Sequence, residues 1–223
     1  PKAVNLAEGA ALPVNFFTAH LALFEMARVR AGDRVLIECA TGGVGTLAVQ
    51  MARAVGADVL GLTTSPAKLG YIEALGARAM TRAAFEADPT EKDFDFILNA
   101  SGGPSVKSQK GRLRITGRMV CMGLNSGVKM GRRNPFRMGW AALRTPRLGL
   151  FSLMNDNAGV FGLNALKVLE DEGWVRRLVS AFEKVDAVGV RPHVDRIFPA
   201  AEVSDAHVYL QTKQARGKLL LAW

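Results

Sequence analysis

Cysteine and histidine are scarce in this 223-residue sequence, which contains two and three of them. A fold held together by disulfides is therefore excluded, and neither residue type occurs at the short spacings that zinc sites use. We expect no metal site, and we interpret Cys39 and Cys121, each placed in an apparent strand, as free buried thiols. Free thiols are typical of a reducing compartment, so we expect a cytoplasmic protein.

Long apolar runs are also missing. No stretch of 18 consecutive apolar residues occurs, so no transmembrane helix is expected. The first residues lack the charged start and apolar block of a secretory signal, and none is expected. Apolar residues nevertheless make up 49% of the chain, which is the proportion of a globular protein with a substantial core.

Acidic residues are absent between Ile97 and Asn155, whereas eleven lysines and arginines lie between Lys107 and Arg147. The net charge of +9 arises from this stretch. It can be a solvated rim that attracts anionic cofactors, or a peripheral membrane contact through residues 107–147. Nucleic acid is not favoured, because no helix-turn-helix, zinc-finger or RNP-type signature accompanies the charge.

A glycine-rich turn is the most informative feature that is present. The apolar run 35–37 predicts a buried strand, and Gly42, Gly43 and Gly45 separate it from a segment of helical periodicity over 46–55. Strand, glycine turn and helix together form the geometry that binds a dinucleotide pyrophosphate. Ala40 takes the first glycine position of that fingerprint. A turn without a ligand remains the alternative, and a P-loop is excluded because no Gly-Lys-Ser/Thr follows.

Strand-like and helix-like segments alternate along the rest of the chain, which predicts right-handed βαβ units. The fold class is therefore α/β, a Rossmann doubly wound parallel sheet of about six strands with helices on both faces. We expect this domain over 1–190 and a C-terminal segment over 191–223. The expected strands are 35–37, 58–64, 76–81, 95–99, 117–123 and 158–164; the expected helices are 6–28 with a break at Pro13, 46–55, 65–75 and 165–184. Beyond them we expect an extended segment at 192–199, a helix at 200–213 and a terminal strand at 217–223.

An acid is missing where the second strand ends, the position at which NAD-binding proteins hold the ribose hydroxyls. Thr64, Ser65 and Lys68 stand there instead. Hydroxyls and an ammonium attract a 2′-phosphate, so the sequence favours NADPH, with Arg82 as a possible second cation. The same missing acid weighs against an S-adenosylmethionine methyltransferase.

Several motifs in serial order resemble a known family: 10–20 (AALPVNFFTAH), 31–37 (AGDRVLI), 40–45 (ATGGVG) and 217–221 (GKLLL). They are similar to the zinc-independent medium-chain dehydrogenases/reductases of the quinone oxidoreductase (zeta-crystallin-like) type. Segments 157–164 and 190–199 resemble the branch of the vesicle amine transport protein homologue. Members carry an N-terminal GroES-like lobe, so we expect this chain to be the nucleotide-binding portion without it, with 191–223 returning to that lobe.

The resemblance implies transfer of a hydride from NADPH to a quinone or an α,β-unsaturated carbonyl, and a homodimer formed through the sixth strand. The cofactor-binding residues it implies are Asn15, Thr18, Thr41, Gly42, Gly43, Val44, Asn99, Ala100, Ser101, Gly123 and Phe161. No catalytic residue is assigned, because the loop after Gly123 lacks the acid of enoyl reductases; Lys107 is only a candidate proton donor. Ala215 also replaces an asparagine common in the family.

Two functions therefore remain open. The first is the NADPH-binding domain of a quinone or enone reductase, incomplete for catalysis on its own. The second is a non-enzymatic protein that associates with a membrane or a partner through the basic stretch, built on a retained Rossmann domain.

Overall fold

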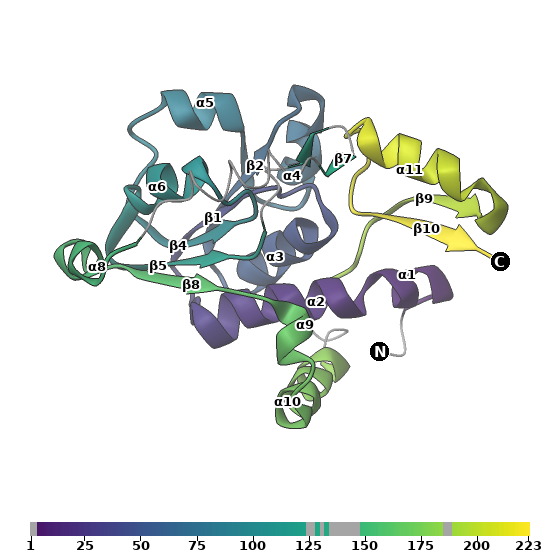
Figure 1. Cartoon of the computed structure of the whole chain (residues 1–223), viewed down its shortest axis with the longest axis horizontal. Coiled ribbons are helices and arrows are strands. Elements are labelled where there is room, and N and C mark those ends of the chain that lie inside the picture. The colour runs from purple at the N-terminus through teal and green to yellow at the C-terminus, as the bar shows by residue number, and fades with distance from the viewer. Residues whose placement is uncertain (1–3, 124–127, 130–131, 134–147, 185–188) are drawn as a thin grey trace.

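A six-stranded parallel sheet forms the centre of the computed structural model, which describes residues 4–123, 128–129, 132–133, 148–184 and 189–223. The strand order is β3-β2-β1-β4-β5-β8 (Figure 1). This confirms the expected Rossmann sheet, with the sixth strand at its edge. The strands are β1 (Arg34–Ile37), β2 (Asp58–Thr63), β3 (Arg78–Thr81), β4 (Phe94–Asn99), β5 (Leu113–Cys121) and β8 (Gly159–Gly162).

Helices cover both faces of the sheet. The larger cluster of buried apolar residues joins one face to α2 (Pro13–His20), α3 (Gly43–Ala54), α4 (Leu69–Ala74) and α10 (Glu172–Glu183). The smaller cluster joins the other face to α5 (Arg82–Ala87) and α6 (Pro104–Lys110). Pro13 separates α1 (Leu6–Ala11) from α2 as expected, because it occupies the first position of α2.

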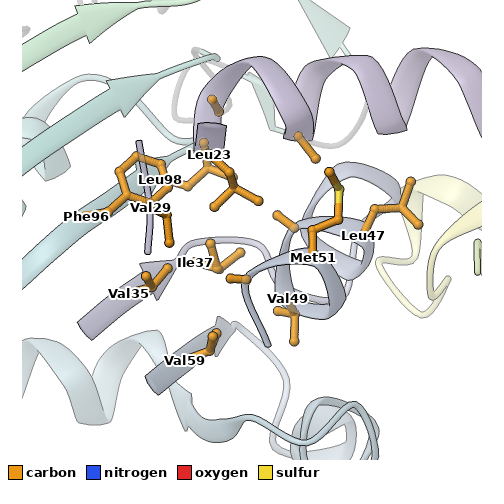
Figure 2. Packing of buried hydrophobic residues seen from close by; sticks show 14 of the residues in the cluster. Leu23, Val29, Val35, Ile37, Leu47, Val49, Met51, Val59, Phe96 and Leu98 are labelled. Atoms are coloured by element: carbon orange, nitrogen blue, oxygen red, sulfur yellow. The ribbon is translucent and has the colours of Figure 1, made fainter. Parts of the chain in front are cut away.

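Strand β1 shows why the sheet is buried on both sides. Val35 and Ile37 belong to the larger cluster, together with Met51 of α3 and Leu98 of β4 (Figure 2). Leu36 points into the smaller cluster on the opposite face. Because successive side chains of a strand alternate between faces, a continuous apolar run is what a central parallel strand requires.

Some local expectations were wrong. The stretch 165–184 forms two helices, α9 (Ala165–Val168) and α10, because the Asp171 carboxylate accepts a hydrogen bond from the Trp174 N–H at 2.9 Å and caps a new helix. Helices α5, α6 and α8 (Leu150–Asp156) were not predicted. Cys39 lies in a turn with φ of +55°, beyond the end of β1 and not inside the strand.

The C-terminal segment forms a small unit beside the sheet. Strands β9 (Val194–Pro199) and β10 (Lys218–Ala222) pair in parallel, apart from the main sheet and near α1 (Figure 1). A 3-10 turn (Ala200–Glu202) and α11 (Val203–Gln211) connect them. The remaining short elements are the π-helical turn Leu21–Met26, the 3-10 turn Pro66–Lys68, β6 (Val128–Lys129) and β7 (Arg132–Arg133). In the described part of the chain, no helix combines the length and the apolar character needed to cross a bilayer.

Candidate functional site

The glycine turn lies at the carboxyl end of β1, where the chain bends over residues 38–42 and enters α3. A Cβ atom placed on Gly45 would lie 2.2 Å from the Cys39 carbonyl oxygen, so only glycine lets the helix approach the turn this closely. Gly42 precedes the first residue of α3, and its N–H donates to the Cys39 carbonyl at 2.9 Å. The first turn of α3 therefore presents its N–H groups at the carboxyl edge of the sheet.

Helix α2 brings a predicted site residue to the same turn. The Asn15 Oδ1 atom lies 3.0 Å from the position that a Gly43 Cβ would occupy, and its Nδ2 donates to the Ala11 carbonyl at 2.6 Å. The Thr18 hydroxyl donates to the Val14 carbonyl of its own helix at 2.7 Å. Asn15 is thus beside the glycines, and Thr18 lies one helical turn further along α2.

Residues 213–218, here called the C-terminal strap, cross the glycine turn. The Gly217 N–H donates to the Thr41 carbonyl at 2.8 Å. Gly217 has φ of +65°, and a Cβ there would lie 2.1 Å from the His193 carbonyl oxygen, so this close crossing requires glycine. Lys218 Cε lies 2.9 Å from where a Gly43 Cβ would be. Sequence reasoning missed the strap, because its contact with the turn joins residues 176 positions apart.

The strap also carries positive charge to this edge of the sheet through Lys213, Arg216 and Lys218. The Arg216 guanidinium lies 5.8 Å from the centre of the Tyr71 ring, and the Tyr71 hydroxyl is 3.2 Å from that of Thr46 in α3. The cations therefore lie near α3, whose N-terminus faces the same edge of the sheet. Both the N-terminus of this helix and the side-chain cations of the strap favour a bound anion there.

The end of β2 differs from the expectation in one respect. Thr64 is exposed and Ser65 is half-buried, but Lys68 is only 7% exposed. Its ammonium donates to the Ala215 carbonyl of the strap at 2.6 Å, and burial lowers its pKa. Lys68 therefore holds the strap in place. Because an ammonium has three N–H donors, a bond to a 2′-phosphate stays a prediction that this contact does not exclude.

The end of β4 is organised by side chains instead of glycines. Glu38 is completely buried, and its Oε2 accepts from the N–H groups of Ala100 and Ser101, both at 2.8 Å. Its Oε1 accepts from Gln109 Nε2 at 3.1 Å and lies 2.6 Å from Arg82 Nη2. Sequence reasoning did not identify Glu38, although an acid directly after a buried strand and before a glycine turn is an available signal.

Two of the predicted residues at this end use their side chains in contacts within the chain, so their roles toward a cofactor stay predictions. We expected Asn99 beside the cofactor, but its amide is consumed internally: Nδ2 donates to Ser105 and Gln109, and Oδ1 accepts from the Gly102 N–H. We also considered Arg82 as a second cation for a 2′-phosphate; its guanidinium instead binds Glu38 and the Ser101 hydroxyl. The Asn99 amide and the Arg82 guanidinium thus provide hydrogen-bond partners for buried polar atoms. Burying those atoms without a partner would cost free energy.

The structure gathers Asn99, Ala100, Ser101 and Gly123 at one place. The Met122 N–H donates to the Asn99 carbonyl at 3.0 Å, and a Cβ on Gly123 would lie 2.6 Å from the Ala100 carbonyl oxygen. The ends of β4 and β5 are therefore in close backbone contact. Phe161 lies on the neighbouring edge strand β8 and is 39% exposed. Whether it flanks a nicotinamide stays a prediction.

The two thiols lie near this end of the sheet, and both are free. Burial, followed by the nearby Glu38 charge, raises the pKa of Cys39 and raises that of Cys121 to about 11. Neither is an activated nucleophile at neutral pH, since the thiolate is the reactive form. Among the described residues, no group of three or more His, Cys, Asp and Glu side chains is arranged to hold a metal ion.

The described part of the basic stretch makes contacts within the molecule. Lys110 pairs with Asp156, Arg114 with Asp95, and Arg118 donates to the Ala27 carbonyl. These cations support the fold. Residues 124–127, 130–131 and 134–147 lie outside the described residues, so the membrane contact predicted over 107–147 stays a prediction.

Comparison with known proteins agrees with this geometry. Residues 43–150 match the family model described as zinc-binding dehydrogenase. The quinone oxidoreductase of Thermus thermophilus, solved also in complex with NADPH, superimposes with a TM-score of 0.81 at 31% identity, covering 100% of this chain and 68% of that one. The chain belongs to the medium-chain dehydrogenase/reductase family.

Curated relatives of this family member are longer than the chain itself. It is 28% identical to the human synaptic vesicle membrane protein VAT-1 homolog over 99% of its own length and 58% of that protein. It is 25% identical to quinone oxidoreductase of Sus scrofa over 99% of its length and 64% of that protein. The chain thus spans about 60% of the length of these two relatives.

Proposed function

We propose that this chain binds NADPH across the carboxyl edge of its sheet. The observation that carries the proposal is the glycine turn at the N-terminus of α3, crossed by a strap that adds three cations. Helix N–H groups and a positive dipole end favour a pyrophosphate at this place. From there the rest of a dinucleotide would extend toward β2 on one side and β4 on the other, on either side of the switch point.

The preference for NADPH over NADH rests on charge at the end of β2. Thr63, Thr64 and Ser65 stand where an NAD site needs a carboxylate, and residues 63–68 contain no acid that would repel a 2′-phosphate. Arg216 of the strap contributes a guanidinium nearby, and guanidinium groups bind phosphates in bidentate geometry. Thr64, Ser65, Lys68 and Arg216 are the proposed 2′-phosphate residues.

The proposed reaction is hydride transfer to a quinone or an α,β-unsaturated carbonyl, without zinc. NADPH supplies the hydride when bound, whereas the chain supplies the groups that bind and orient it. Backbone groups of Ala100, Ser101 and Gly123 are the proposed border of the nicotinamide, and no proton donor is assigned. Lys107 is exposed on α6 and stays a candidate.

A titration tests the cofactor proposal. NADPH and NADH are added separately to the chain, and their fluorescence reports binding; NADPH is expected to bind at least about tenfold more tightly, the value of one charge-assisted hydrogen bond. Arg216→Gln is expected to remove most of that preference, whereas Arg176→Gln on the exposed face of α10 leaves it unchanged. Equal affinities of the wild-type chain for both cofactors would contradict the assignment.

We also infer a homodimer and a reducing, cytoplasmic environment. Strand β8 is an edge of the main sheet, and an edge offers unpaired backbone groups to a second copy. Free cysteines support the reducing environment. Light scattering measures the dimer: twice the mass of one chain is expected, and a single-chain mass at all concentrations would refute it.

A further inference from the structure

We propose that Glu38 is a positioning residue for the nicotinamide end of the cofactor. It fixes the backbone of residues 100–103, here called the β4–α6 loop, which our proposed function places beside the nicotinamide. This inference therefore rests on the proposed function. Glu38 itself is completely buried, so we assign it a role through the loop and not through contact with the cofactor.

The contacts of the Glu38 carboxylate converge from three elements. Its Oε2 accepts two consecutive loop N–H groups, those of Ala100 and Ser101. Its Oε1 receives Gln109 from α6 and Arg82 from the start of α5. Arg82 Nη2 also donates to the Ser101 hydroxyl at 2.5 Å. Oε2 thus holds the loop directly, and Oε1 holds it through Gln109 and Arg82.

A second set of bonds fixes the next residue of the loop. Gln109 Oε1 accepts from Asn99 Nδ2 at 2.7 Å, and Asn99 Oδ1 accepts from the Gly102 N–H at 2.8 Å. Three consecutive loop N–H groups, 100 to 102, therefore point inward to side chains connected with one another. All three loop N–H groups have an acceptor, whereas Arg82 Nε is buried without a hydrogen-bond partner among the described residues. A buried network that binds three consecutive N–H groups restricts the backbone that carries them.

The loop needs this support because its sequence is permissive. Gly102 and Gly103 have φ of +61° and +60°, a conformation that glycine adopts freely but does not favour over others. The Ala100 carbonyl is also in close contact with Gly123 at the end of β5. A shift of the loop would therefore move the two backbone segments that are proposed to border the nicotinamide.

The charge and the two oxygens of Glu38 are both required. In Glu38→Gln one oxygen becomes an NH₂ group, so either the two loop N–H groups or the Arg82 and Gln109 donors face another donor. The loop is then released from one side. Within the described residues, the Glu38 carboxylate bonds to Ala100, Ser101, Gln109 and Arg82, and none of these belongs to the adenosine end of the site, which is built from Gly42 to Gly45, the end of β2 and the strap.

Two ligands separate the ends of the site. NADPH spans both, whereas adenosine 2′,5′-bisphosphate carries only the adenosine end. We expect Glu38→Gln to weaken NADPH binding about tenfold and to change binding of the bisphosphate less than about threefold, as measured by calorimetry. Gln109→Leu removes one donor to Glu38 and one partner of Asn99, and is expected to act in the same direction by about threefold.

The matched control is Glu91→Gln. Glu91 is also a buried carboxylate that binds two arginines, Arg34 and Arg78, but these stand at the first residues of β1 and β3, the opposite edge of the sheet. This variant carries a similar loss of ion pairs and should leave binding of both ligands unchanged.

The outcomes are distinguishable. Failure of the wild-type chain to bind either ligand refutes the proposed function itself. Equal weakening of both ligands by Glu38→Gln, or unchanged NADPH binding in both Glu38→Gln and Gln109→Leu, overturns the positioning role while the proposed function stands. If Glu38→Gln does not fold, Gln109→Leu decides, because a selective loss of NADPH binding is required of it too.

Discussion

The two ends of the carboxyl edge are built in opposite ways. At the end of β1, the backbone forms the surface: glycines permit a close approach, α3 presents N–H groups, and Gly217 of the strap donates to the Thr41 carbonyl. At the end of β4, the backbone N–H groups are already bonded to the buried side chains of Glu38 and Asn99.

This difference teaches what each end can do. Free N–H groups and nearby cations bind a charged phosphate directly. A loop whose N–H groups point inward instead offers a fixed shape and its outward atoms, which suits the orientation of a neutral ring. The two ends should consequently respond differently to substitution. The end of β1 should be sensitive to added side-chain volume, and the end of β4 to the loss of a hydrogen-bonding group.

The largest effect is expected from Gly45→Val. The new Cβ would lie 2.2 Å from the Cys39 carbonyl and 2.8 Å from Ala40 Cα, both backbone atoms that cannot yield without moving β1 or α3. We expect the free energy of unfolding to fall by more than about 4 kcal/mol, measured by urea unfolding. Gly70→Ala, at a helical glycine with nothing within 4 Å, is the control and should be neutral or stabilising. A stable Gly45→Val chain would show that the turn is not as close as described.

The next effect is expected from Glu38→Leu. This change leaves the Arg82 guanidinium and three N–H groups without their acceptor in a buried site, at a cost of about 3–5 kcal/mol in unfolding free energy. Glu172→Ala removes an exposed pair with Arg176 and should stay within about 0.5 kcal/mol of the wild type. Similar small losses in both variants would mean that the network at the end of β4 is not desolvated.

A smaller effect is expected from Gly217→Ala. The positive φ and the 2.1 Å approach to the His193 carbonyl strain any side chain there, at a cost of about 1–3 kcal/mol. Because the strap would shift off the glycine turn, NADPH should bind more weakly while the β4–α6 loop keeps its hydrogen-exchange protection. Loss of protection in that loop would show that the two ends are not independent.

The smallest effect concerns the reactivity of Cys121. Burial and the Glu38 charge raise its pKa from 9.0 to about 11, so at pH 8 its thiolate fraction is about a hundredfold below that of an unperturbed thiol. In a Cys39→Ser chain, the rate of iodoacetamide labelling should keep rising from pH 9 toward 11. A plateau at pH 9 would indicate that this end of the sheet is open to water.

The same contrast explains what the sequence could predict. The six strands and the glycine turn follow from local patterns, since an apolar run and three closely spaced glycines are contiguous. Glu38 and Gln109 are 71 residues apart, and neither carries a local signature of their hydrogen bond. Helix α6 was missed because it is only seven residues long, although Pro104 at its first position is a helix-start signal.

Lys68 lies between these two situations: the sequence identified the residue but not its contact. Its place after β2 follows from the order of elements, but the Ala215 carbonyl that it binds comes from 147 residues further along the chain. Local sequence reports which residues reach an edge of the sheet. It does not report which distant segment folds over that edge.

The most direct test is a crystal structure of the chain with NADPH bound. We expect the pyrophosphate at the N-terminus of α3 beside Gly42 and Gly43, the 2′-phosphate near Ser65 and Arg216, and the nicotinamide against residues 100–102. A dinucleotide bound elsewhere, or a glycine turn filled by protein side chains in its presence, would contradict the proposed site.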